Sequence, residues 1–227
     1  MMSLPFNADQ FLRIFAQYNQ AVWPMQLVLN GAALACAALL FCAQPWASRT
    51  IALLLAGLWL WMAVAYHYTF FALINPAAWW FGVLFLLAAA AFDWFGVIED
   101  KLRFRASRNP WKLTGAMLIV FAVAIYPLIS YALGRRYPAA PTFGLPCPTT
   151  IFTIGALLFA EPPLPRIVFL VPIIWCAIGS LAALWLGLLE DLSLLVAGLV
   201  GLAAIFNLHG RPGKLVWHSN TPHSVRP

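Results

Sequence analysis

The feature that most constrains this chain is a series of apolar runs of about 20 residues, the length at which a helix crosses the ~30 Å hydrocarbon core of a bilayer. Short polar or proline-rich stretches separate these runs. Hydrophobic residues make up 63% of the sequence and charged residues 9%, whereas a soluble domain is about half apolar and a quarter charged. A packed core cannot absorb that excess, so lipid must be the solvent for part of the surface.

The apolar runs predict one all-α domain over residues 1–209, an integral membrane bundle of seven transmembrane helices. The predicted spans are 24–43, 50–74, 77–98, 113–133, 143–160, 166–189 and 192–208. Residues 210–227 are rich in Gly, Pro, His and Ser and predict a flexible cytoplasmic tail. The turn at Glu190–Asp191 between the last two spans is predicted to be solvated.

A different kind of helix is expected over residues 7–22. Asn7 is suited to cap a helix, and Gln10 stands three residues later, where it completes a capping box. Apolar residues follow at helical spacing with polar ones between them, at Phe11, Ile14, Phe15, Tyr18 and Val22. This pattern predicts an amphipathic helix that lies in the membrane interface before the chain turns into the first span.

The length of the fifth predicted span does not decide whether this segment crosses the membrane. We expect its helix to run from Pro148 to Ala160, which rises only about 20 Å, so the segment 143–160 either crosses with an extended part or re-enters. Seven crossings place three of the 13 Lys and Arg residues on one side and ten on the other, whereas six crossings divide them almost evenly. The positive-inside rule therefore favours seven spans, with the N-terminus outside and the C-terminus in the cytoplasm.

On this topology the unusual polar residues gather toward the outer side and predict an outward-facing polar pocket. The predicted pocket residues are Tyr18, Asn19, His67, Asn75, Cys147, Thr149, Thr150 and Thr153. His67 is the only histidine inside a span, and such groups tend to face a cavity or the bundle interior. Cys147 stands at the start of a helix, where the dipole and free N–H groups favour a thiolate. The threonines also fit a simple packing role, bonding carbonyls of their own helix.

Three functions are compatible with this pattern. The first is a small-molecule permease or binding protein with the outward-facing pocket. The second is an intramembrane thiol enzyme with Cys147 as nucleophile and His67 as base. The third is a structural or accessory membrane subunit. No nucleotide-binding, serine-hydrolase or metalloprotease motif occurs, so the sequence assigns no catalytic residue, cofactor or metal and favours a role other than an enzyme. The expected partners are the lipid bilayer and a small-molecule ligand, with no nucleic acid; oligomeric partners stay open.

Two segments carry a family resemblance. Residues 67–78 (HYTFFALINPAA) and 141–153 (PTFGLPCPTTIFT), together with Tyr18–Asn19 and Trp23–Pro24, resemble a bacterial family catalogued as domain of unknown function 6064. The resemblance extends over nearly the whole chain and implies a multi-pass protein of the bacterial inner (plasma) membrane. Some members are labelled permease on hydrophobicity, and the family brings no established activity or catalytic residue.

Overall fold

The structure is a computed structural model that describes residues 5–209, and all its named elements are helical within that range. The predicted tail, 210–227, lies outside the described residues. The α-helices are α1 (Ala8–Ala21), α2 (Met25–Leu39), α3 (Pro45–Trp61), α4 (Ala78–Asp93), α5 (Pro110–Val120), α6 (Tyr126–Ala132), α7 (Pro146–Leu157), α8 (Ile167–Leu186) and α9 (Ser193–His209). Short segments of other helical pitch continue or join them: η1 (Met62–Tyr68), η2 (Phe71–Leu73), η3 (Trp94–Ile98), η4 (Phe121–Ile125) and η5 (Leu189–Leu192).

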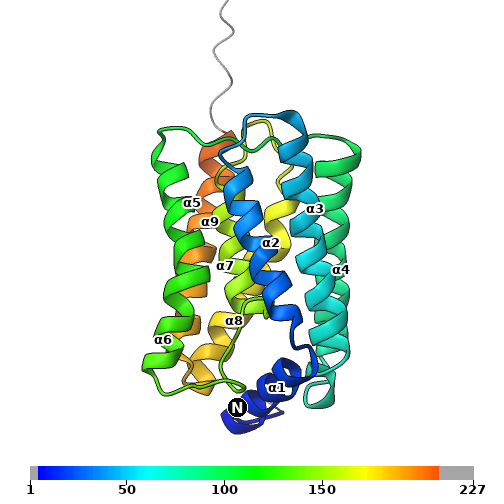
Figure 1. The fold of residues 1–227 in the computed structure, drawn as a ribbon, viewed down its shortest axis with the longest axis vertical. Coiled ribbons are helices and arrows are strands. Elements are labelled where there is room, and N and C mark those ends of the chain that lie inside the picture. The colour runs from blue at the N-terminus through cyan, green and yellow to red at the C-terminus, as the bar shows by residue number, and fades with distance from the viewer. Residues whose placement is uncertain (1–4, 210–227) are drawn as a thin grey trace, which may run out of the picture.

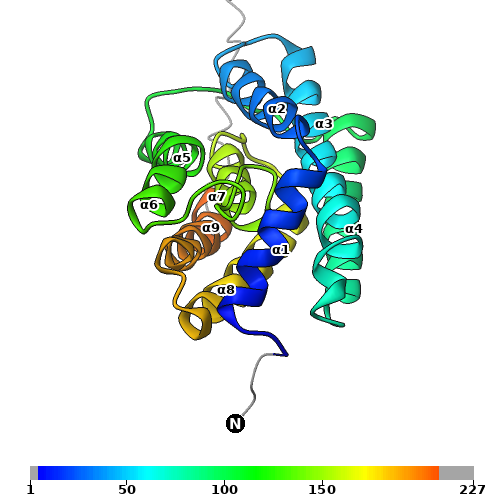
Figure 2. The same ribbon diagram turned by 60° about the horizontal axis from the view of Figure 1, so that its bottom comes forward.

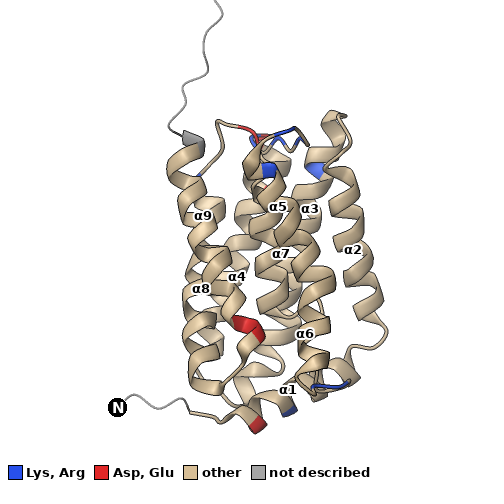
Figure 3. Cartoon of the chain, turned by 90° about the vertical axis from the view of Figure 1, so that its left-hand side faces the viewer, with Lys and Arg blue, Asp and Glu red and all other residues tan. Residues whose placement is uncertain are grey.

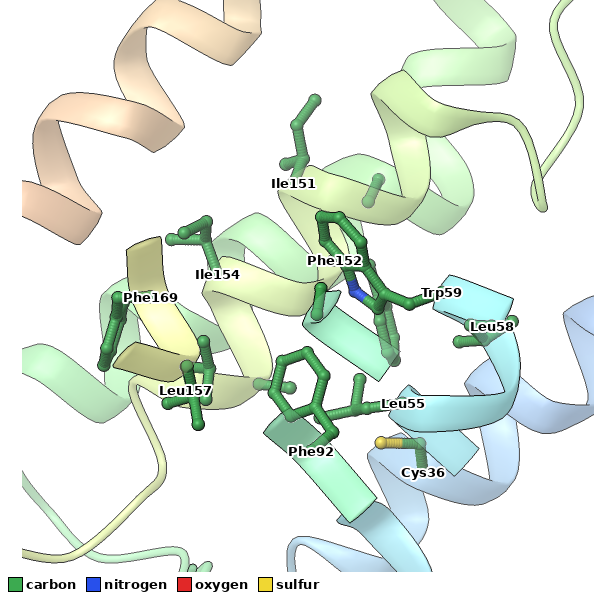
Figure 4. Close-up of a cluster of buried hydrophobic side chains, with 14 of the residues drawn as sticks. Cys36, Leu55, Leu58, Trp59, Phe92, Ile151, Phe152, Ile154, Leu157 and Phe169 are labelled. Carbon is green, nitrogen blue, oxygen red and sulfur yellow. The ribbon is translucent and has the colours of Figure 1, made fainter. Parts of the chain in front are cut away.

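The long helices run side by side along one axis, and α1 lies across one end of the bundle (Figure 1). Seen from that end, α7 is surrounded by the other helices, and α1 lies over α8 (Figure 2). Every residue of α7 is buried. Its apolar side chains, such as Phe152 and Leu157, pack beside Trp59 of α3 and Phe92 of α4 in the main core (Figure 4). The centre of the bundle is therefore a short helix with no lipid-facing side.

Five helical segments are long and apolar enough to cross a membrane. They are Pro45–Leu73, Ala78–Ile98, Pro110–Ala132, Ile167–Leu186 and Leu189–Asn207. The pair α1 and α2 passes the same test together, but the chain bends by 91° between them. Within residues 5–209 the fold is thus all-helical with five candidate spans, or six if the bent pair is one broken span. The seven spans of the sequence prediction include α2 and the 12-residue α7, whose rise of about 18 Å is less than the ~30 Å core.

The start of α1 follows directly from its sequence. The Asn7 side chain accepts a hydrogen bond from the Gln10 backbone at 2.9 Å, and the Gln10 side chain accepts one from the Asn7 backbone at 2.9 Å. This is the reciprocal capping box that the sequence predicts. The apolar face of α1 (Phe11, Ile14 and Phe15) is buried in a second hydrophobic cluster with residues near η1 and η2. The helix over 7–22 is therefore confirmed as a helix, and its interfacial position stays a prediction.

The central helix α7 is held at both ends by specific contacts. It begins at Pro146, two residues earlier than expected, because prolines fit the first turn, where no intrahelical N–H bond is made. Before it, Gly144 has a φ of 98° and donates its N–H to the Thr149 hydroxyl at 3.1 Å. Beyond its other end, the Lys112 ammonium donates to the carbonyls of Phe159 at 2.6 Å and Ala160 at 3.1 Å. These contacts fix the depth of α7 in the bundle.

A close helix contact fixes α7 laterally. A Cβ on Gly155 would lie 2.8 Å from the carbonyl oxygen of Gly115 in α5, and a Cβ on Gly115 would lie 2.6 Å from the carbonyl oxygen of Gly155. Real Cβ atoms do not approach backbone that closely, so only glycine permits this crossing. Small residues at such crossings let helix backbones touch, as is typical of helix pairs in membranes.

Candidate functional site

The most unusual feature of the structure is a pair of buried carboxylates, Glu190 and Asp191, in η5. They are 3% and 4% exposed, so the prediction of a solvated turn at this position was wrong. Figure 3 shows this acidic segment set in from the end of the bundle, between α8 and α6. Burying an acidic group costs free energy unless the group is paired and hydrogen-bonded. The partners of Glu190 and Asp191 therefore explain how both can be buried here.

Glu190 is neutralised by an arginine from the loop after α6. One guanidinium nitrogen of Arg135 donates to both carboxylate oxygens of Glu190, and the Ser130 hydroxyl donates to the same carboxylate at 2.8 Å. The side chains of Arg135 and Glu190 are 16% and 2% exposed. This ion pair ties the loop after α6 to the turn between α8 and α9.

Asp191 has neutral hydrogen-bond partners instead of a cation of its own. The Tyr126 hydroxyl of α6 donates to its carboxylate, and the Cys147 thiol of α7 is its other side-chain hydrogen-bond partner. The charged groups that act on Asp191 are Glu190 and Arg135. Three elements that are distant in sequence thus bring a hydroxyl, a thiol and a carboxylate together.

Cys147 and Asp191 form part of the wall of a cavity of about 340 Å³. The rest of the wall is almost wholly apolar and largely aromatic, and comes from the N-terminal segment, η1, η2, α4 and α8. It consists of Phe6, Phe11, Phe15, Tyr66, Phe71, Asn75, Phe81, Pro146, Trp175, Ile178, Gly179, Leu181, Ala182, Trp185 and Leu188. The volume is at the lower end of the range for ligand sites, about 300–1,000 Å³.

The cavity has one side toward the outer surface of the bundle. Among its wall residues, Leu181 and Trp185 of α8 are 61% and 55% exposed, whereas Phe6 and Phe11 are 6% and 8% exposed. The α1 segment lies across α8 at this place (Figure 2). The N-terminal segment therefore covers the cavity, and its uncovered edge is the apolar outer face of α8.

Of the eight predicted pocket residues, Asn75 and Cys147 line this cavity. All eight are buried, and the elements that carry them lie toward the end of the bundle covered by α1. The cavity itself is less polar than the predicted pocket, and the outward-facing polar pocket stays a prediction.

Asn19 and Tyr18 of α1 hold the loop before α7 and the neighbouring helix. The Asn19 amide donates to the carbonyls of Pro138 at 2.6 Å and Ala140 at 2.8 Å, and its oxygen accepts from the Thr142 hydroxyl at 2.7 Å. The Tyr18 hydroxyl accepts from the Trp61 indole at 2.7 Å. These contacts anchor the C-terminal half of α1 and leave no donor or acceptor of Asn19 free for a ligand.

The three threonines of α7 serve the helix itself. Thr149 accepts from Gly144, and the Thr153 hydroxyl donates to the Thr149 carbonyl at 2.8 Å and accepts from the Trp59 indole at 3.1 Å. The Thr150 hydroxyl is buried without a hydrogen-bond partner in the described part of the chain. Thr153 bonds the carbonyl four residues earlier, as the packing role requires, whereas Thr149 instead accepts from the loop before the helix.

The His67 side chain is enclosed by aromatic rings, and it takes no part in the hydrogen bonds of Cys147. Its ring is 4.5 Å from that of Phe85 and 5.2 Å from that of Trp175, measured between centroids. Neither ring nitrogen has a hydrogen-bond partner among the described residues. The thiol enzyme hypothesis requires His67 to bond the Cys147 thiol, and the structure places Asp191 beside that thiol instead.

The residues that sequence reasoning missed are Glu190, Asp191 and the partners Arg135, Ser130 and Tyr126. One signal was available, because the seven-span topology puts the loop after Arg135 and the turn at Glu190 on the same side. Opposite charges on neighbouring loops of one side can pair. No three His, Cys, Asp or Glu side chains in the described range come close enough to hold a metal ion.

These features define a class: an all-helical protein with several helices able to cross a membrane, a central short helix, and an aromatic cavity at one end. The chain belongs to the family of unknown function DUF6064, whose model matches residues 8–213, so the resemblance seen in the sequence is confirmed. No curated protein and no solved structure matches the chain.

Proposed function

We propose that this protein is an integral membrane protein of the bacterial inner membrane that binds a hydrophobic small molecule in the cavity beside Asp191 and Cys147. The observation that carries the proposal is the cavity itself, about 340 Å³, with an aromatic wall and few polar groups. Cavities of this kind, apolar with a small number of placed polar groups, are the usual form of small-molecule sites.

The proposed topology has seven spans, with α1 as an interfacial helix on the outer side. The distribution of basic residues supports it, since in the sequence Arg13, Arg135 and Arg136 fall on one side of the seven predicted spans and the other ten on the opposite side. The extended residues on either side of α7 would supply the depth that its 12 residues lack. The cavity would then open at the level of the outer leaflet.

The uncovered edge of the cavity supports access from lipid. Leu181 and Trp185 belong both to the cavity wall and to the exposed apolar surface of α8. A ligand dissolved in the outer leaflet would therefore reach the cavity without crossing water. The Trp175 indole N–H lines the cavity at 6% exposure, has no hydrogen-bond partner in the part of the chain that the structure describes, and offers a donor to such a ligand.

Binding is favoured over transport because α7 is packed tightly below the cavity. The contact of Gly155 with Gly115 leaves no room for even a methyl group, and Ile151, Phe152 and Ile154 are fully buried. A permease would need these contacts to open, whereas a binding protein uses the structure as it stands.

The test is saturable binding of an apolar probe, radiolabelled decanol, to the purified full-length protein in detergent, measured by scintillation proximity. Ala182→Phe fills the cavity from α8 and is expected to weaken binding at least about tenfold, which corresponds to about 1.4 kcal/mol. Ala177→Phe is the matched control, because Ala177 is on the same helix, exposed and outside the cavity wall. No saturable binding to the wild type, or equal binding by both variants, would refute the proposal and favour a structural subunit.

A further inference from the structure

The charges around the cavity do not balance, and this imbalance indicates the class of ligand. Two carboxylates, Glu190 and Asp191, are buried within one turn of each other. Arg135 is the cation that acts on Asp191, and its guanidinium is bonded to both oxygens of Glu190. With all three groups ionised, the cluster carries one uncompensated negative charge, located at the Asp191 carboxylate.

The contacts of Asp191 solvate this charge without neutralising it. The Tyr126 hydroxyl and the Cys147 thiol are neutral donors. Among the described residues that line the cavity there is no Lys or Arg. A buried carboxylate is costly without an opposite charge, so it either takes up a proton or gains a cation that the described chain does not provide. A cationic group in the cavity would stabilise the ionised form of Asp191.

The remaining wall suits the rest of such a ligand. Aromatic rings of Phe11, Phe15, Phe71 and Trp175 face the cavity, and the faces of aromatic rings attract ammonium groups as well as apolar chains. An anionic ligand would place its charge against Asp191. A strongly polar ligand would leave most of its hydrogen-bonding groups unpaired, because this wall has few polar groups, such as Asn75 and the Trp175 indole N–H.

We propose that the cavity binds a cationic amphiphile, a lipophilic amine or quaternary ammonium compound whose charged head pairs with Asp191 and whose apolar tail lies among the aromatic side chains. This inference rests on the proposed function and adds the chemical class of the ligand. The head lies beside Cys147 at the start of α7, and the tail extends toward the exposed edge at Trp185.

The experiment compares three radiolabelled probes with the same ten-carbon chain: decyltrimethylammonium, decanol and decanoate. Each is titrated against the full-length wild-type protein in the same detergent. We expect the cation to bind at least about tenfold more tightly than decanol, and decanoate to bind most weakly. In Asp191→Asn the preference for the cation over decanol disappears, whereas Asp191→Glu keeps the preference. Comparing variants in one detergent cancels the different partition of the probes into micelles.

The outcomes separate the two proposals. Equal binding of cation and decanol by the wild type, preference for decanoate, or a cation preference that survives in Asp191→Asn overturns the inference and leaves the proposed function standing. Absence of saturable binding for all three probes overturns the proposed function. If Asp191→Asn does not fold, as judged by size-exclusion chromatography, the wild-type comparison and Asp191→Glu still decide the question.

Discussion

The ion pair between Arg135 and Glu190 allows a quantitative test of the buried acidic cluster. Arg135→Ala removes the one charged partner that the described residues 5–209 give to a carboxylate whose side chain is 2% exposed. Breaking a buried pair from one side costs about 3–5 kcal/mol, because an uncompensated charge remains. The Ser130 hydroxyl still donates to Glu190 at 2.8 Å. We therefore expect Arg135→Ala to lower the free energy of unfolding by about 3 kcal/mol, the lower end of this range.

Removing the charge of Glu190 should lower the free energy of unfolding less than removing Arg135 does. In Glu190→Gln the side chain keeps its size and its bond to Ser130, and Arg135, at 16% exposure, lies closer to the end of the bundle. We expect about 1–2 kcal/mol, the usual cost of a weakened buried hydrogen bond. The double variant should be close to Glu190→Gln alone, so the coupling energy equals the cost of Arg135→Ala, about 3 kcal/mol.

The assay is thermal unfolding of the purified variants in one detergent, followed by tryptophan fluorescence. For a protein of this size 1 kcal/mol corresponds to about 2–4 °C, so Arg135→Ala should lower Tm by about 6–12 °C. The matched control is Arg136→Ala, because Arg136 is exposed and contacts Tyr131 alone; it should change stability by less than about 1 kcal/mol. A double variant as unstable as Arg135→Ala would refute the reasoning, since neutralising the carboxylate would then have recovered nothing.

Three further predictions concern packing, measured in the same unfolding assay. Gly155→Ala forces a methyl group against the backbone of α5 and should destabilise by about 1–3 kcal/mol; Gly57→Ala, at an exposed helical site with nothing within 4 Å of the new Cβ, should stabilise by about 0.5–1 kcal/mol. If both changes have the same effect, α5 and α7 are not in close contact. His67→Phe keeps the aromatic packing and removes two buried nitrogens without hydrogen-bond partners, so it should preserve or raise Tm; a large loss would show that His67 has a polar partner. Lys112→Met loses two charge-assisted bonds at the end of α7 and should cost about 2–3 kcal/mol, whereas an unchanged Tm would mean that other groups satisfy those carbonyls.

Much of the fold could be predicted because it depends on local patterns. The capping box fixes the start of α1 to within one residue, and the apolar runs locate the long helices, as at Ala78–Ile98 for a predicted span of 77–98. The break after α1 also follows from the sequence, since Trp23–Pro24 interrupts the helix there. These features are decided within a few residues of where they occur.

The site could not be predicted to the same degree because its contacts are long-range. Cys147 was a candidate from its place before a helix, but its partner Asp191 is in another loop, and helical spacing does not say which neighbouring helix a side chain faces. His67 satisfied the same sequence criteria and lies among aromatic rings without a polar contact. A polar residue in an apolar helix is therefore a signal of burial, and its partner has to come from the three-dimensional structure.

The turn at Glu190–Asp191, wrongly predicted to be solvated, shows how a local sequence pattern can be overridden by long-range contacts. Two adjacent acids after a glycine are typical of a solvated turn, and at the end of a membrane helix they would ordinarily reach water. Here the loop after α6 carries Arg135 over the turn, and Tyr126 and Ser130 on the same helix provide neutral donors one turn apart. One arginine can neutralise one carboxylate. The second carboxylate lies in the cavity wall with Cys147 and has neutral donors. This difference between adjacent residues is why we propose Asp191 as the ligand-binding group and Glu190 as the structural one.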